Sequence, residues 1–231
     1  MKYKSIKAFD LPDAWWKVLK TIWDEGDTFT VQHGSELGET KKLNLTIEVT
    51  NPEIRPIIHQ LAPNDMDYVN GYSLNYLWNP VADDSSYTYG SRLRTPIDQL
   101  TTIANRFVEY AGDRQCTAVV RLQEDILKEM KHPPCLSLLD FELSNNKLHM
   151  TGYFRSWDAY GGFPANQAGL QLINEAIVSI INSKTDLNYT TGKMVFHSKN
   201  CHIYDRQYEL VKELFSTRSL KELKEEWTNK D

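Results

Sequence analysis

The stretch from residue 136 to residue 154 is the feature that most constrains the fold. It contains two strand-like segments, LSLLDFEL and KLHMTGYF, which are separated by the polar turn Ser144-Asn145-Asn146. Short runs rich in strand-forming residues and bounded by such a turn predict an antiparallel β-hairpin. The chain therefore contains a sheet, and other elements must cover the apolar face of that sheet.

Three helices are predicted around this hairpin from apolar residues at helical spacing. The first follows Asp10 and ends at Gly26, and the long third helix begins at Pro164. The second helix is expected to begin at Thr95-Pro96 and to end at Gly112, with Ile97 on its buried face. These helices can supply the layer that packs against the sheet.

Further strands are predicted at residues 43–49, at 115–121 (QCTAVVR, read as buried) and at 193–199, and two charged helices follow them. Because the elements do not alternate as regular βαβ units, we predict an α+β fold with a mixed, mostly antiparallel sheet flanked by helices. No composition shift marks a boundary, so residues 1–231 are read as one domain with a charged helical tail from about residue 216.

Composition excludes several classes of protein. Hydrophobic residues make up 41% of the chain and charged residues 25%, and no apolar run approaches the roughly 18 residues of a membrane helix. The N-terminus lacks a signal-peptide core, so we expect a cytoplasmic protein without membrane partners. A net charge of −5 argues against a broad nucleic-acid surface. Three cysteines without ligand spacing predict reduced thiols and no metal site.

Cys135 is the first candidate for chemistry. A free cysteine taken alone is more often a small buried apolar residue than a nucleophile. Cys135, however, follows Pro133-Pro134 at the entry to the hairpin, whose second strand ends at Arg155. If the hairpin brings Arg155 back to Cys135, the guanidinium favours the thiolate and makes the sulfur a usable nucleophile near neutral pH.

A second cluster follows directly. Arg155 and Ser156 offer donors that suit a phosphate, whereas Asp158 would repel an anion and suits the donor edge of an amino-substituted heterocycle. The alternative is an exposed charged turn. Further on, Gly161-Gly162 permits close approach of a flat ligand, and the amide of Asn166 matches the O4 acceptor and N3–H donor of uracil, unless Asn166 is simply a helix cap.

His202 and Tyr204 lie two residues apart, which is strand spacing, so both side chains share one face and could contact a sugar hydroxyl together. A pair of satisfied core residues is the alternative. Three motifs now stand in order: HPPC at 132–135, FRSWDAYGGFPAN at 154–166 and HIY at 202–204. Together they resemble the nucleophile, phosphate and base-reading motifs of the thymidylate synthase family. The strings IRPIIHQLAPND, GYSLNYLWNP and YTYGSRLR are similar to those of its short archaeal-type members, and the resemblance covers about residues 10–215.

The resemblance implies a function. Cys135 would attack C6 of dUMP, and a methylene-carrying reduced pterin, either 5,10-methylenetetrahydrofolate or its methanopterin analogue, would supply the carbon and hydride that give dTMP. Cys135, Tyr89, Asn166 and Asp158 would form the catalytic set. The remaining implied contacts are Arg155, Ser156 and Arg114 to the phosphate, Asn166 to the uracil, His202 and Tyr204 to the deoxyribose, and Asp158, Gly162 and Trp78 to the pterin. Arg114 would come from the other subunit of a homodimer.

Several positions depart from the common pattern of this family. No arginine stands in 33–42, Gln115 replaces a second arginine, Gln60 stands near the place of the acid/base glutamate, and Ala165 replaces a phenylalanine. The charged C-terminus also differs from one that closes over the site. Two alternatives therefore remain: a 5-hydroxymethylase of dUMP or dCMP, if water reaches the exocyclic methylene, and a nucleotide-binding protein without turnover.

Overall fold

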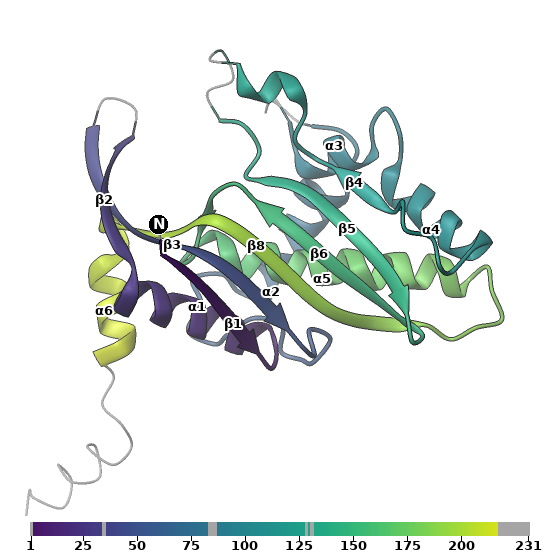
Figure 1. Cartoon of the computed structure of the whole chain (residues 1–231), viewed down its shortest axis with the longest axis horizontal. Helices are drawn as coiled ribbons and strands as arrows, with labels where there is room; N and C mark the ends of the chain where they lie inside the picture. Colours follow the sequence, from purple (N-terminus) through teal and green to yellow (C-terminus); the bar gives the residue numbers. More distant parts are fainter. Residues whose placement is uncertain (1, 34–35, 83–86, 128, 130–131, 217–231) are drawn as a thin grey trace, which may run out of the picture.

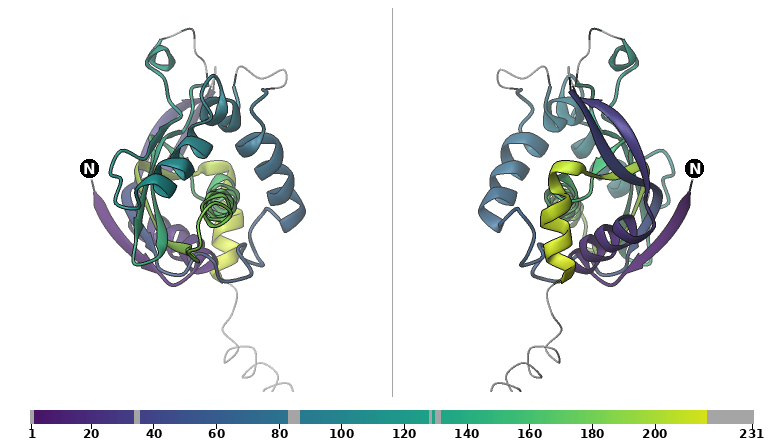
Figure 2. Two further views of the ribbon diagram at one scale, coloured as in Figure 1. Left: turned by 90° about the vertical axis from the view of Figure 1, so that its right-hand side faces the viewer. Right: turned by 90° about the vertical axis from the view of Figure 1, so that its left-hand side faces the viewer.

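The computed structural model describes residues 2–33, 36–82, 87–127, 129 and 132–216. It contains one mixed sheet of eight strands, and helices gather on one face of this sheet (Figures 1 and 2). The strands are β1 (Tyr3–Ala8), β2 (Asp27–His33), β3 (Glu36–Val49), β4 (Thr117–Val119), β5 (Leu136–Ser144), β6 (Lys147–Phe154), β7 (Trp157–Asp158) and β8 (Thr190–Tyr204). The helices are α1 (Leu11–Glu25), α2 (Met66–Tyr72), the π-helix η1 (Ser73–Trp78), α3 (Tyr89–Arg94), α4 (Gln99–Glu109), the short 3₁₀ turns η2 (Gln123–Ile126) and η3 (Asp205–Gln207), α5 (Gly162–Asn182) and α6 (Tyr208–Ser216).

The strand order confirms the predicted α+β class. Strands follow the order β1-β3-β8-β6-β5-β4, with β2 paired to β3 and β7 paired to β8. The pairs β2/β3, β3/β8, β4/β5 and β5/β6 are antiparallel, while β1/β3, β6/β8 and β7/β8 are parallel. The sheet is thus mixed and mostly antiparallel, and the long strand β8 occupies its centre.

The β5–β6 hairpin has a tighter turn than the sequence suggests. Ser144 pairs with Lys147, so the connection consists of Asn145 and Asn146 alone. Both asparagines have positive φ angles, 50° and 58°. Asparagine tolerates this left-handed conformation better than most residues, and two such residues match the right-handed twist of the flanking strands. The turn fixes the register that returns β6 to the start of β5.

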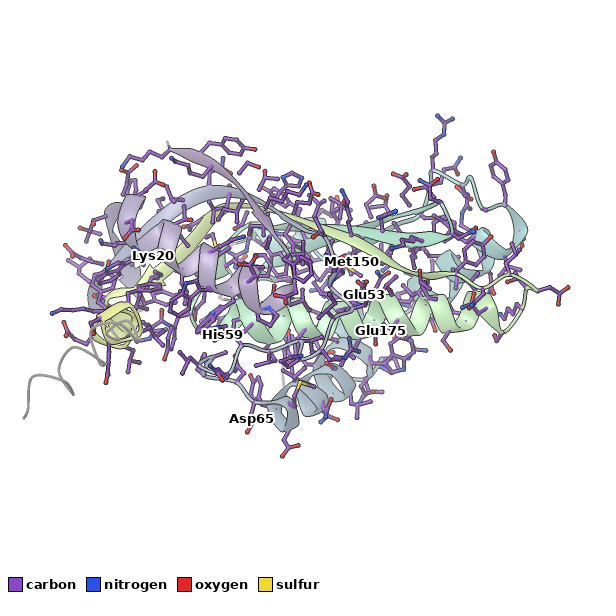
Figure 3. The ribbon with its side chains drawn as sticks, turned by 90° about the horizontal axis from the view of Figure 1, so that it is seen from below. Lys20, Glu53, His59, Asp65, Met150 and Glu175 are labelled. Carbon is purple, nitrogen blue, oxygen red and sulfur yellow. The ribbon has the colours of Figure 1, made fainter. Side chains whose placement is uncertain are left out.

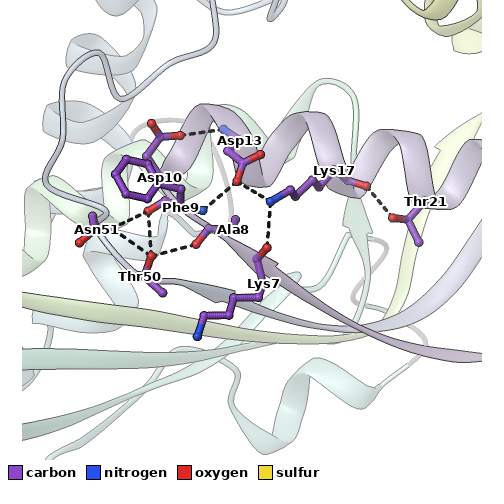
Figure 4. A network of polar contacts seen from close by, with 9 residues as sticks. All are labelled: Lys7, Ala8, Phe9, Asp10, Asp13, Lys17, Thr21, Thr50 and Asn51. Carbon is purple, nitrogen blue, oxygen red and sulfur yellow. Dashed lines mark hydrogen bonds and ion pairs between the residues drawn. The ribbon is translucent and has the colours of Figure 1, made fainter.

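Helix α1 begins where the sequence predicts. The Asp10 side chain accepts a hydrogen bond from the backbone N–H of Asp13 at 2.9 Å, and the Asp13 carboxylate accepts from the N–H of Phe9 at 2.8 Å (Figure 4). Lys17 donates to the same carboxylate one turn later. The bond to Asp10 satisfies one of the free N–H groups of the first turn, and the helix ends before Gly26 as expected.

Helix α5 lies in the middle of the fold, between the sheet and the α2–η1 segment (Figure 2). Its predicted apolar residues Ile173, Ile177 and Ile181 are buried, and Met150 of β6 is buried on the helical side of the sheet (Figure 3). A Cβ at Gly169 would lie 2.4 Å from Leu77, so only glycine permits η1 to pack this closely on α5. This contact positions the tyrosines described below.

Two predicted boundaries are wrong. Thr95 caps the C-terminus of α3, and α4 begins only after Asp98, whose side chain accepts from the N–H of Thr101. Ile97 therefore lies between the two helices and is 64% exposed. The segment 115–121 is also not a fully buried strand. Only 117–119 forms β4, at the edge of the sheet, and its side chains alternate between exposed and buried.

The predicted charged tail lies mostly outside the described residues, because these end at Ser216 with α6. Within the described part of the chain, no helix is long and apolar enough to cross a membrane. In the same part, no group of three or more His, Cys, Asp or Glu side chains is arranged to hold a metal ion.

Candidate active site

The hairpin register places Arg155 beside Cys135. The backbone N–H of Arg155 donates to the carbonyl oxygen of Cys135 at 2.9 Å. The guanidinium turns back along the same segment, donating from Nε to the Pro134 carbonyl at 2.9 Å and from Nη2 to the Pro133 carbonyl at 2.6 Å. Arginine has five N–H donors, and among the described residues these two bonds leave three of them for a ligand. The cation is thus fixed next to the thiol.

The half-buried thiol of Cys135 does not have the lowered pKa that the sequence suggests. Burial raises the pKa of the Cys135 thiol, the charges of Arg155 and Arg121 lower it, and the charge of Asp158 raises it, with burial the largest effect. The net direction is upward. The expectation that Arg155 makes the thiolate available near neutral pH is therefore wrong for the ligand-free protein, although the charge of Arg155 acts in the expected direction.

Arg121 is a second cation that the sequence analysis missed. It is half-buried, its backbone N–H donates to the Ser137 carbonyl at 3.1 Å, and its charge lowers the pKa of the Cys135 thiol. Among the described residues, its buried Nε has no hydrogen-bond partner. The available signal was its position at the end of the 115–121 segment, directly before the loop that leads to Cys135.

Asn166 is not a helix cap. Helix α5 begins at Gly162, which places Asn166 in its second turn and makes the capping alternative wrong. The indole Nε1 of Trp157 donates to Asn166 Oδ1 at 2.8 Å, and Asn166 Nδ2 donates to the hydroxyl oxygen of Tyr72 at 2.6 Å. The amide is therefore held at both of its polar atoms. Neither Trp157 nor Tyr72 was singled out from the sequence.

Four tyrosines, here called the tyrosine wall, connect Asn166 with Cys135. The wall consists of Tyr72, Tyr76, Tyr87 and Tyr89. The ring of Tyr76 stacks on Tyr72 at 5.3 Å and meets Tyr89 edge-on at 5.1 Å, while Tyr87 stacks on Tyr89 at 6.3 Å. The hydroxyl oxygen of Tyr89 accepts from the N–H of Leu136, the residue after Cys135, at 3.2 Å.

Every hydroxyl of the tyrosine wall has a raised pKa. Burial is the largest cause at all four positions, and the charge of a neighbouring Cys135 thiolate adds to it at Tyr76, Tyr87 and Tyr89. These hydroxyls therefore stay protonated and neutral, which suits them to donate hydrogen bonds to a ligand oxygen.

Asp158 serves the loop that precedes α5. Its carboxylate accepts from the backbone N–H groups of Tyr160 at 3.0 Å and Gly161 at 3.2 Å, and from Gln207 Nε2 at 3.2 Å. A Cβ built at Gly162 would lie 3.6 Å from Asp158 Cβ and 3.7 Å from Asn166 Oδ1. Asp158, Gly162 and Asn166 thus lie side by side, but the carboxylate already holds several local donors.

Strand β8 brings His202 to the same region. Asp158 of β7 pairs with His202 in parallel register, and Ser156 Oγ lies 3.5 Å from His202 Nδ1. The rings of His202 and Tyr204 meet edge-on at 4.5 Å. Burial raises the pKa of Tyr204, and smaller contributions come from the charges of Cys135, which raises it, and Arg155, which lowers it. This pair therefore lies in the same electrostatic neighbourhood as the thiol.

A family model described as thymidylate synthase matches residues 18–230 of the chain. The chain belongs to the thymidylate synthase family. Two similar archaeal proteins carry the provisional name thymidylate synthase: one from Methanosarcina acetivorans, 30% identical over 212 residues, and one from Methanosarcina mazei, 29% identical over 212 residues. Both alignments cover 90% of this chain and 93% of the relative. A third, from Methanothermobacter marburgensis, is 25% identical over 224 residues, with 90% and 96% covered.

Three further residues suggested by the family resemblance lie outside the contacts described above. Arg114 is exposed beside Glu142 and Leu143, at the opposite end of β5. Trp78, at the end of η1, is half-buried with the Arg94 guanidinium 4.3 Å above its ring. Gln60, near the place of the thymidylate synthase glutamate, is exposed and lines a surface hollow with Trp16 and His59, next to α1 (Figure 3).

Proposed function

We propose that this chain is a thymidylate synthase that converts dUMP to dTMP by adding Cys135 to C6 of the uracil ring. The observation that carries the proposal is the continuous contact path from Cys135 through Leu136 and the tyrosine wall to Asn166. A nucleophile, two cations and an amide suited to uracil thus meet in one region of a fold whose family acts on this class of substrate.

The side of the site that lies at the start of β5 and the end of β6 suits the nucleotide phosphate. Among the described residues, Arg155 has three N–H donors that its bonds to Pro133 and Pro134 do not use, and Arg121 has a buried Nε without a partner. Ser156 adds a hydroxyl. Guanidinium groups bind phosphate oxygens through charge-assisted hydrogen bonds. Arg121 would supply a cation from the same subunit, which compensates for the absence of arginine in residues 33–42.

The covalent step needs a thiolate, so the Cys135 thiol must give up its proton to solvent water before the sulfur attacks. Ring carbonyl O4, held by donors at the Asn166 end, draws electron density from C6 and makes that carbon electrophilic. The Cys135 sulfur then bonds to C6, and the electron pair of the C5–C6 bond makes C5 nucleophilic. A bound methylene-carrying reduced pterin would supply both the carbon that joins C5 and the hydride that completes the methyl group.

Proton removal from C5 is assigned to the hydroxyl of Tyr89, which lies at the backbone of Leu136 beside the sulfur. Its raised pKa makes it a poor base on its own, so we expect it to orient a water that accepts the proton. When the thiolate leaves C6, dTMP is released. His202 and Tyr204 would contact the deoxyribose.

Asp158, Gly162 and Trp78 are proposed to contact the pterin, either a tetrahydrofolate or a tetrahydromethanopterin. The protein is also proposed to act as a homodimer. The sheet face away from the helices is left uncovered in one chain (Figure 2), and side chains of β6 on that face, such as His149 and Tyr153, are half-buried. Pairing two such faces would let the exposed Arg114 reach the phosphate bound by its partner.

Product analysis tests this proposal. Purified protein is incubated with [5-³H]dUMP and, separately, with the methylene forms of tetrahydrofolate and tetrahydromethanopterin, while tritium release and nucleotide products are measured. We expect tritium release with at least one pterin and dTMP as the product. If 5-hydroxymethyl-dUMP is the only product, the chain is instead a hydroxymethylase. If dUMP binds without tritium release, it is a nucleotide-binding protein without turnover.

A further inference from the structure

The amide of Asn166 is held in one of its two orientations by two neighbours, Trp157 and Tyr72, to which the sequence alone assigned no role. We propose that Trp157 is the positioning residue that makes the site specific for uracil over cytosine, because its indole N–H fixes the Asn166 amide in the orientation that matches uracil. This inference rests on the proposed function, since it assumes that Asn166 contacts the pyrimidine ring.

Trp157 decides the orientation because its indole can only donate. An indole Nε1–H has no lone pair to offer, so the atom facing it at 2.8 Å must be the amide oxygen of Asn166. The indole itself cannot turn away. It is 2% exposed, it stacks on Phe154 at 3.8 Å with an interplanar angle of 5°, and it contacts Phe163 at 4.3 Å.

Tyr72 holds the other end of the amide. Its hydroxyl oxygen accepts from Asn166 Nδ2 at 2.6 Å, so its own O–H is directed elsewhere. Burial raises the pKa of Tyr72 well above its ordinary value, and the hydroxyl therefore remains a donor at every physiological pH. A protonated hydroxyl beside the amide suits a carbonyl oxygen such as uracil O4.

The two bonds leave a defined recognition edge. An asparagine amide has two N–H groups and two oxygen lone pairs, and Trp157 and Tyr72 use one of each. One N–H and one lone pair remain for the ring. They match the O4 acceptor and the N3–H donor of uracil, whereas cytosine presents an amino donor and an N3 acceptor at the same places.

Cytosine could be read only if the amide rotated by half a turn. The NH₂ group of Asn166 would then face the indole N–H of Trp157, with two donors opposed and none satisfied. An unsatisfied buried donor costs about 1–3 kcal/mol, which corresponds to roughly ten- to a hundredfold in affinity. Trp157 thus lowers the affinity for dCMP as well as favouring dUMP.

The test compares the affinities of dUMP and dCMP by calorimetry, without pterin or turnover, in wild type and in Trp157→Phe. Phenylalanine keeps an aromatic ring at this position but removes the N–H. We expect the affinity ratio of dUMP over dCMP to fall by about tenfold or more, mainly through a gain for dCMP. Tyr68→Phe is the matched control. Tyr68 stacks on Tyr72 at 6.2 Å, but the bond to Asn166 comes from Tyr72. The ratio of dUMP over dCMP affinity in Tyr68→Phe should therefore equal that of wild type.

An unchanged ratio of dUMP over dCMP affinity in Trp157→Phe overturns the inference. Such a result would mean that the substitution affects the binding of both nucleotides alike, as a general loss of stability would. If Trp157→Phe does not fold, site-specific replacement of Trp157 by benzothienylalanine decides, because this analogue keeps the bicyclic ring and lacks the N–H. The ratio of dUMP over dCMP affinity should again fall by about tenfold or more. Failure of the proposed function looks different: wild-type protein would then bind neither nucleotide.

Discussion

The two sides of the candidate site are built by different means. On one side, Cys135 and Arg155 stand at the ends of paired strands, and backbone hydrogen bonds set the distance between them. On the other side, the tyrosine wall comes from α2, η1, α3 and the residue before the α3 cap, and it is held by ring packing and by the close approach of η1 to α5 at Gly169. The first side carries charge, and the second side is neutral.

This difference assigns a separate task to each side. Cations next to the thiol suit the phosphate and the developing thiolate, whereas protonated tyrosines suit the carbonyl groups of a pyrimidine. The charged side should therefore control chemistry and phosphate affinity, and the tyrosine side should control the ring. Substitutions on the two sides are expected to differ in size and in kind.

The largest effect is expected from Cys135→Ala. Without the sulfur no bond to C6 can form, so tritium release from [5-³H]dUMP should fall by at least about 10⁴-fold, the size typical of lost nucleophiles. Cys116→Ala is the matched control, because Cys116 is a fully buried thiol that precedes β4. Substantial tritium release by the Cys135→Ala variant would show that Cys135 is not the nucleophile.

Arg155→Met should have the next largest effect. It removes a cation that lowers the pKa of the thiol, together with the donors to the Pro133 and Pro134 carbonyls. Charged hydrogen bonds contribute about 1.5–3 kcal/mol each, so kcat/KM for dUMP should fall by about a hundredfold. Arg55→Met, which affects an exposed pair with Glu175 and a bond to the Glu53 carbonyl, should have no effect. Equal losses in the two variants would contradict the role of Arg155.

Tyr89→Phe tests the tyrosine side. The variant loses the hydroxyl that accepts from the N–H of Leu136 but keeps the ring that packs against Tyr76. We expect kcat to fall by about tenfold while the KM for dUMP changes little, because the hydroxyl acts on the proton at C5 and not on the phosphate. A rise in KM with unchanged kcat would show that Tyr89 binds the nucleotide instead.

The smallest effect concerns the ligand-free thiol. Since only the thiolate reacts with iodoacetamide and burial raises the pKa of Cys135, its alkylation should be slow at neutral pH and should accelerate as pH rises. Arg155→Met raises this pKa further and should slow alkylation a few-fold at neutral pH. Alkylation of the buried Cys116 and Cys201 is measured in the Cys135→Ala variant and subtracted. A rate already at its plateau at neutral pH would contradict the upward shift.

The charged side was largely predictable from the sequence, and the physical reason is strand register. The hairpin pattern and its asparagine turn return β6 to the start of β5, and a register shift between Leu136 and Leu138, which the sequence did not predict, brings Arg155 opposite Cys135. The predicted α+β class and the start of α1 followed from similar local signals. The prediction failed on the pKa of Cys135, since burial depends on segments that are distant in sequence.

The tyrosine side was not predictable in the same way. Prolines interrupt the segment around residues 52–80, so no periodic pattern of hydrophobic residues predicted α2 or η1. The contacts of Asn166 depend on a helix that begins two residues before Pro164 and on a π-helix packed at Gly169. Arg121 was missed because its neighbour in space, Ser137, is remote in sequence.

The central claim is that the sulfur of Cys135 bonds to C6 of the uracil ring, and 5-fluoro-dUMP tests it directly. Fluorine cannot leave C5 as a cation, so the reaction should stall with the bond between sulfur and C6 intact. After incubation with the nucleotide and a methylene-carrying pterin, proteolysis and mass spectrometry should find the added mass on the peptide that contains Cys135. Absence of any adduct, or an adduct on the peptide of Cys116 or Cys201, would contradict the account.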